Sequence, residues 1–185
     1  RHSSLAAVCT TSGVAKGRIM SARLLYAHFP AASHRSALEW MRVVAEIASG
    51  HPGVGPFASG QEPLPALEPA VAWRLVSENR REIARGCRVF TDEGAARIDL
   101  AQLLRAASTF EIHTSPAPRL RSTGWFVSAR GSLVMMGARR YEKRSAAESA
   151  AALAVRLMQE LAATASRGTD LGRGRPAPVD PLILQ

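Results

Sequence analysis

The chain has 185 residues, of which 46% are hydrophobic, so it is long enough and apolar enough to bury a core. It carries 24 Lys and Arg against 15 Asp and Glu, a formal net charge of +9, and its sequence pI is about 11.1. This excess favours a polyanionic partner, such as RNA, DNA or an acidic membrane surface, over a charge that serves only solubility. No run of 18 apolar residues occurs, so the sequence predicts no membrane span.

Residues that could carry catalysis or hold a metal are sparse. The two cysteines, Cys9 and Cys87, are far apart and predict neither a disulfide framework nor a zinc site. The five histidines are scattered without ligand spacing, so we expect no metal and no cofactor. Glu111 and His113 share one face of a predicted strand, but a single such pair is common by chance. We therefore predict that the protein is not an enzyme.

The N-terminal stretch contains no Asp or Glu before Glu39. It is rich in Arg, Ser and Ala, which is typical of a mitochondrial transit peptide; the alternative is a basic tail of a nuclear or cytosolic protein. We expect residues 1–35 to be an extended basic arm and the protein to be located in the mitochondrial matrix.

The next part of the chain, residues 36–86, is predicted to be helical around a loop. Apolar residues recur at helical spacing over 36–49, and a second helix is predicted over 67–86, ending at Gly86. Between them, residues 51–65 are rich in Gly and Pro and predict a loop. We expect the arginines of the second helix to lie mostly on a solvated face, with contact to phosphate as the alternative; they are Arg74, Arg80, Arg81 and Arg85.

From residue 87 the pattern changes to that of an α+β domain, residues 87–166, followed by an extended tail, 167–185. Arg130 and Gly131 fit the tight turn of a β-hairpin, because glycine supplies the positive φ that such turns need. A long helix with an apolar stripe is predicted over 145–166. The other predicted elements are a strand at 87–91, a helix at 98–107, a strand at 108–114, a loop at 115–122, and strands at 123–129 and 132–138.

Three helix starts show the spacing of a capping pair, in which two side chains satisfy exposed backbone N–H groups. The predicted pairs are Ser36 with Glu39, Asp99 with Gln102, and Ser145 with Glu148.

Three segments carry a resemblance to a known family: RVFTDEGAARIDLAQL, GWFVSARGSLVMMGARR and RRYEKRSAAESAAALAVRLMQEL. Together they make residues 87–164 resemble one repeat of the TATA-box-binding-protein fold. The resemblance implies an antiparallel sheet with a long C-terminal helix packed on one face. We therefore predict a single such repeat, preceded by two helices and the N-terminal arm.

The resemblance is weaker where that family contacts DNA. Its members wedge phenylalanines between base steps of the minor groove. The wedge before the hairpin turn falls on Ser128, its partner falls near Glu111, and a groove-reading asparagine falls near Cys87. The resemblance thus supports the fold and argues against DNA bending by this chain alone. In that family two repeats together form a saddle that binds the minor groove, and a homodimer could form such a saddle from two single repeats.

Two sets of residues are candidates for contact with nucleic acid. Trp125, Phe126, Leu133 and Met135 could stack on bases, but a core role is the favoured interpretation because a strand as a rule buries one face. Clustered arginines form strong contacts with phosphate, the alternative being a solvated rim. The predicted phosphate-binding residues, opposed only by Glu142, are Arg119, Arg121, Arg130, Arg139, Arg140, Lys143 and Arg144.

The sequence favours a structural RNA-binding protein of an organellar ribonucleoprotein, most plausibly a mitochondrial ribosomal protein that contacts rRNA and neighbouring proteins. One alternative is a transcription factor related to the TATA-box-binding protein. The other is an accessory subunit of a mitochondrial membrane complex, docked through apolar residues such as Leu182–Leu184.

Overall fold

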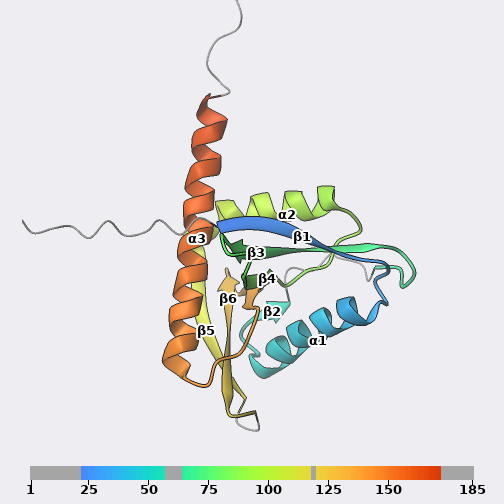
Figure 1. Ribbon diagram of the computed structural model, residues 1–185, viewed down its shortest axis with the longest axis vertical. Helices are drawn as coiled ribbons and strands as arrows, with labels where there is room; N and C mark the ends of the chain where they lie inside the picture. The colour runs from blue at the N-terminus through green and yellow to red at the C-terminus, as the bar shows by residue number, and fades with distance from the viewer. Residues whose placement is uncertain (1–21, 57–63, 118–119, 172–185) are drawn as a thin grey trace, which may run out of the picture.

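One twisted antiparallel sheet organises the part of the chain that the computed structural model describes, residues 22–56, 64–117 and 120–171. Six strands lie in the order β1-β3-β4-β7-β6-β5, so β1 and β5 are the two edges. Helix α1 lies on one face of the sheet, and helices α2 and α3 lie on the other (Figure 1). The strands are β1 (Ala22–Phe29), β3 (Ala70–Ser77), β4 (Glu82–Gly86), β5 (Phe110–Ala117), β6 (Ser122–Ala129) and β7 (Ser132–Gly137).

The helices are α1 (Arg35–Gly50), α2 (Glu93–Arg105) and α3 (Arg144–Leu171), with a short 3₁₀ turn at Ala107–Thr109. A two-residue strand, β2 (Gly55–Pro56), pairs in parallel with the start of β7. The α+β class and the long helix on an antiparallel sheet are confirmed.

The helix predicted over 67–86 is wrong, because this segment forms the hairpin β3–β4. Val71, Trp73 and Leu75 enter the core under α2 and α3, whereas Ala70 and Ala72 enter the core under α1. A strand buried on both faces reads as a continuous apolar run, which periodicity alone does not distinguish from a helix. The chain turns at Arg80, whose φ of 57° interrupts any helix.

The extended arm predicted over residues 1–35 is wrong over its second half. Residues 22–29 form β1, which pairs with β3 along its whole length, from Ala22 opposite Ser77 to Phe29 opposite Ala70. The first 21 residues lie outside the described part of the chain. Strand β1 and the β3–β4 hairpin extend the sheet well beyond the segment that resembles the TATA-box-binding-protein repeat.

The hairpin β6–β7 is confirmed, and so is its two-residue turn. Arg130 has φ 52° and Gly131 has φ 75°, the positive values that a type I′ turn requires. The strand predicted at 87–91 is wrong, because only Phe90 makes an isolated bridge, with Val71. The loop predicted at 115–122 is wrong at its start, since β5 continues through Pro116; an edge strand tolerates proline because its outer N–H has no partner to lose.

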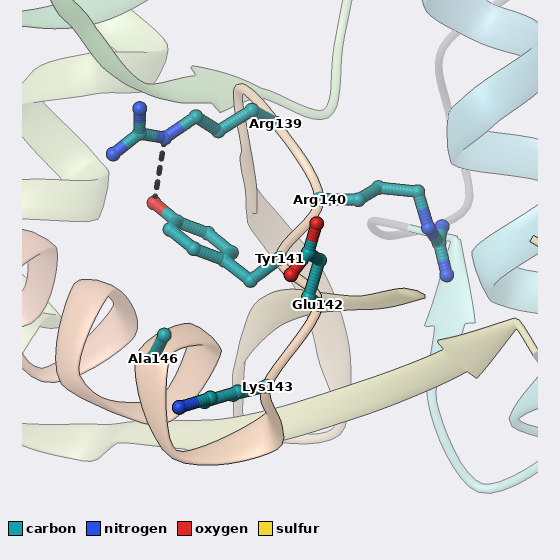
Figure 2. Close-up of a pocket in the computed structure, with 6 residues that line it drawn as sticks. All are labelled: Arg139, Arg140, Tyr141, Glu142, Lys143 and Ala146. Atoms are coloured by element: carbon teal, nitrogen blue, oxygen red, sulfur yellow. Dashed lines mark hydrogen bonds between the residues drawn. The ribbon is translucent and has the colours of Figure 1, made fainter. Parts of the chain in front are cut away.

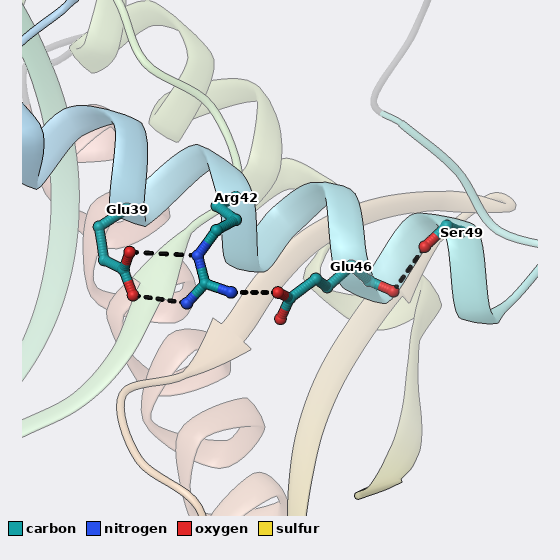
Figure 3. A network of polar contacts seen from close by, with 4 residues as sticks. All are labelled: Glu39, Arg42, Glu46 and Ser49. Atoms are coloured by element: carbon teal, nitrogen blue, oxygen red, sulfur yellow. Dashed lines mark hydrogen bonds and ion pairs between the residues drawn. The ribbon is translucent and has the colours of Figure 1, made fainter.

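Helix starts differ from the predicted capping pairs. The N-cap of α2 is Asp92, which accepts a hydrogen bond from the Ala95 N–H, so α2 begins five residues before residue 98. The N-cap of α1 is His34, whose ring accepts from the Ser36 N–H. Glu39 instead pairs with Arg42, which also reaches Glu46 along the exposed side of α1 (Figure 3). The predicted pair of Ser145 with Glu148 is also wrong, because Glu148 accepts a hydrogen bond from the Arg144 side chain.

Two tryptophans lie against glycines on the neighbouring strand in the core under α2 and α3. A Cβ on Gly86 would lie 2.7 Å from the Trp73 ring, and one on Gly137 would lie 2.7 Å from the Trp125 ring. Both indoles are almost fully buried. These close contacts let large rings lie flat between the sheet and the helices.

Helix α3 is about 42 Å long at 1.5 Å per residue and projects beyond the sheet (Figure 1). It continues to Leu171, five residues past the predicted end. Its predicted stripe packs on the sheet: Ala154, Leu157 and Met158 are buried, whereas Ala150, Leu153 and Leu161 are half-buried. Alanines at the contact let the helix approach closely.

The loss of stability on truncating a side chain of this stripe should therefore depend on how deeply that side chain is buried. We expect Leu157→Ala to lower the free energy of unfolding by about 2–5 kcal/mol, because it leaves a cavity, and Leu153→Ala to cost clearly less. Urea titration of both variants measures the difference. Equal losses at the two positions would contradict the packing of α3 described here.

Candidate nucleic-acid interface

The predicted basic residues divide between the two ends of β6. Arg121 precedes the strand and Arg130 follows it, which separates them by about 30 Å at 3.4 Å per residue. Because β7 runs antiparallel to β6, the residues after β7 return to the Arg121 end. Arg139, Arg140, Lys143 and Arg144 therefore gather near Arg121, with Arg130 apart from them. Arg119 lies outside the described residues.

Within that group the side chains point to different faces of the sheet, and Arg139 and Arg140 diverge (Figure 2). Arg139 donates from Nε to the Tyr141 hydroxyl at 3.1 Å and lies over the Tyr141 ring. It lines a pocket with Arg81, Ala150 and Leu153 on the α3 side. Arg144 donates to Glu148 along α3. The structure thus does not bring the predicted cluster together as one surface.

Arg140 lies on the other face, where it crosses two strands. Its Nε donates to Ser122 Oγ at 3.1 Å, and its Nη2 donates to the Ser115 carbonyl at 2.8 Å. Gly124 leaves room for it, since a Cβ there would lie 3.3 Å from Arg140 Nη1. Arg140 remains exposed to solvent while its orientation is fixed.

The face that Arg140 occupies is only partly covered by α1. One row of side chains crosses it from edge to edge, each paired with the next: Leu25, Arg74, Arg85, Met136, Phe126 and His113. Helix α1 contacts this row through Trp40, which packs on Arg85, and the residue that caps its C-terminal end, His51, packs against Phe126. The core that α1 covers lies to one side of the row, at Phe29, Ala70, Cys87 and Leu133.

On the other side of the row the sheet is not covered by α1. We call this region, together with the arginines of the row, the open half; its charged residues are Arg23, Arg74, Glu82, Arg85 and Arg140. Four arginines thus face one carboxylate. Arg74 lies on β3, whereas the Arg140 side chain contacts β6 and β5 near the opposite edge of the sheet.

Arg74 and Arg85 are directly opposite each other on β3 and β4. Like charges in this position destabilise a sheet. Arg85 is compensated, since it donates to both carboxylate oxygens of Glu82, at 2.7 and 3.4 Å, and stacks on Trp40. Arg74 is not, because its Nε is buried and no acceptor for it exists among the described residues. The open half therefore contains a cation that lacks a counter-ion in the described part of the chain.

A second polar group lies where the row reaches the β5 edge. His113 Nε2 lies 2.8 Å from Ser128 Oγ, and its ring is stacked on Phe126, with centroids 4.7 Å apart and an interplanar angle of 12°. Glu111 Oε2 is 4.0 Å from the same Nε2. A nucleophilic triad needs the carboxylate on the opposite ring nitrogen and an accessible hydroxyl, whereas Ser128 is only 1% exposed. This group does not have the geometry of a triad.

The residues considered as stacking candidates from the sequence have a core role. Trp125, Phe126, Leu133 and Met135 are all at most 2% exposed. The two wedge positions of the resemblance, Ser128 and Glu111, do face each other across β5 and β6, but they present a buried hydroxyl and a carboxylate.

One buried ion pair lies outside the open half and ties α2 to the chain after β4. Arg88 Nη1 donates to Asp99 Oδ1 at 2.6 Å. Burial raises the pKa of the Asp99 carboxyl, and Arg88 opposes that shift. Burial, with the charge of Asp99, also raises the pKa of the Cys87 thiol well above its usual range. The Cys87 thiol is therefore protonated near neutral pH, which makes it a poor nucleophile.

Within residues 22–56, 64–117 and 120–171 no three His, Cys, Asp or Glu side chains are close enough to share a metal ion. No helix in these ranges is long and apolar enough to cross a membrane. Neither a protein-family model, nor a curated protein, nor a solved structure matches the chain. The resemblance to a TATA-box-binding-protein repeat therefore stays a hypothesis.

The open half predicts opposite effects for two neighbouring arginines. Arg74→Met keeps the aliphatic stem but removes the uncompensated charge, so we expect the free energy of unfolding to rise, by about 1 kcal/mol. Arg85→Met removes the partner of Glu82 and should lower it. Urea titration at low ionic strength measures both. A loss at Arg74 equal to that at Arg85 would mean that Arg74 is already compensated.

Proposed function

We propose that this chain is a structural RNA-binding protein of a mitochondrial ribonucleoprotein, a ribosomal protein that contacts rRNA and neighbouring proteins in the matrix. The observation that carries the proposal is the open half, where Arg74, beside Arg85, has no counter-ion among the described residues and Arg140 is held in place while exposed to solvent. A phosphate backbone supplies repeated anions at such a surface, and arginine binds phosphate in a planar, bidentate geometry.

This arrangement is suited to holding RNA rather than to catalysing a reaction on it. Arg23, Arg74 and Arg140 come from β1, from β3 and from the loop after β7, so their spacing is set by the sheet rather than by flexible loops alone. Each phosphate contact releases condensed counter-ions, which supplies affinity without reading sequence. The protein would thus hold an RNA segment in place, and the RNA itself would determine the conformation of that segment.

RNA is favoured over duplex DNA because the positions where the TATA-box-binding-protein family wedges base steps hold Ser128 and Glu111 here. The mitochondrial assignment depends on composition, namely the acid-poor, Arg- and Ser-rich N-terminal stretch.

Direct binding tests the role of the open half. We expect the triple variant Arg23→Gln, Arg74→Gln, Arg140→Gln to weaken binding of a fluorescein-labelled 12-nucleotide single-stranded RNA. The slope of log K against log salt should fall by about 0.7 for each phosphate that is no longer neutralised by an arginine. The matched control removes the same charge from exposed residues on α2 and α3, Arg97, Arg105 and Arg156, and should have little effect on either quantity. Equal losses in both triple variants would show that net charge alone binds RNA.

Crosslinking in cells tests whether the protein belongs to a mitochondrial ribonucleoprotein. Ultraviolet crosslinking of the native protein, followed by sequencing, should recover mitochondrial rRNA, with crosslinked peptides from β1, β3 and the loop after β7. Recovery of promoter DNA would instead support a transcription factor. Co-purifying membrane subunits without RNA would support a membrane-complex subunit, and either result would overturn the proposal.

A further inference from the structure

His113 presents an aromatic ring at the margin of the open half. Its ring is stacked on Phe126, which is fully buried, while the His113 side chain is 31% exposed. Since His113 and Phe126 are direct partners on β5 and β6, the two rings stand side by side above the sheet. Strand β5 is an edge of the sheet, so no described strand lies beyond the far side of the His113 ring.

The ring is held in a fixed orientation. Ser128 Oγ, 2.8 Å from Nε2, fixes its rotation, and this serine is itself buried. The His51 ring packs edge-on against Phe126, with the two ring centroids 4.6 Å apart. Little side-chain freedom would be lost when a flat ligand packs on the imidazole, and a platform that is ordered in advance binds with a smaller entropic cost.

An arginine is anchored on the same strand as His113. Ser115, two residues from His113 and about 7 Å along β5, accepts the hydrogen bond that anchors Arg140. Both side chains rise from the same face of the sheet. A flat ring and an arginine anchored on the same strand are suited to the two parts of a nucleotide, its base and its phosphate.

We propose that His113 is a stacking platform for one base of single-stranded RNA, with Arg140 on the adjoining phosphate. This inference rests on the proposed RNA-binding function and adds to it the class of RNA that is recognised. In a duplex both faces of each base are occupied by neighbours, so only an unpaired base can pack on the ring. Stacking on a ring tolerates every base, so the site selects single strands rather than a sequence.

The test separates stacking from charge in the full-length chain. The probes are fluorescein-labelled oligo(U) of 12 nucleotides and a 12-base-pair RNA duplex, measured by fluorescence anisotropy across a salt series. His113→Ala should weaken binding of oligo(U) about 5- to 150-fold, the range for removal of one base stack, and leave duplex binding unchanged. Its salt slope should equal that of the wild type, whereas Arg140→Gln should lower the slope by about 0.7.

His113→Phe serves as the conservative variant. It keeps a flat ring that packs on Phe126 but lacks the ring nitrogens, so it should bind oligo(U) nearly as the wild type does. An oligo(U) with one 2-aminopurine should show quenched emission on binding to the wild type and to His113→Phe, but not to His113→Ala. Thermal unfolding of each variant establishes that it is folded at the assay temperature.

The outcomes are distinguishable. If the wild type binds neither probe, the proposed function fails, and the platform fails with it. If oligo(U) binding depends on Arg23, Arg74 and Arg140 but His113→Ala matches the wild type, RNA binding stands and the stacking role is overturned. A loss of affinity in His113→Phe as large as in His113→Ala would assign the effect to the imidazole nitrogens and also overturn it.

Discussion

Unequal helical cover of the two sheet faces is the constraint on which the rest of the structure depends. Helices α2 and α3 bury Trp73, Trp125 and Met135 on one face, where glycines on neighbouring strands make room for the indoles. On the other face α1 is the one helix among the described residues, and it buries its side of the row around Phe126 together with Val54. Because one helix of this length does not span that face, the strands continue past it, and the side chains there are free to be charged.

This division separates the buried core from a charged surface within one sheet. The same strand, β3, contributes Trp73 and Leu75 to the core and Arg74 to the open half, because alternate residues face opposite sides. A local conflict such as Arg74 beside Arg85 persists when the surrounding core outweighs it, and such conflicts concentrate at functional sites. The deep core under α2 and α3 thus allows an unfavourable charge arrangement on the face opposite.

How much the sequence predicts depends on whether the signal is local. The hairpin β6–β7 and helix α3 are predicted because Arg130-Gly131 and an alanine-rich stripe each determine their own segment. Strands β1, β3 and β4 are missed because their identity comes from pairing with distant residues. For the same reason Arg140 is among the phosphate-binding candidates taken from the sequence, but Arg74 and Arg85 are assigned to a helix. The Ser128 contact of His113 depends on strand register, which no local pattern reveals.

The two sheet edges have a consequence for the life of the protein in a cell. Among the described residues, β1 and β5 each pair with a strand on one side only, and Leu25 and Ile112 are exposed on these edge strands. A charged residue such as Arg23 and a proline such as Pro116 typically hinder the pairing of an edge strand with another chain. Each of them affects only part of its strand. A chain whose edges stay open is therefore prone to pair with other chains through these strands. Such pairing would lower the abundance of the protein, because chaperones and proteases remove the paired chains.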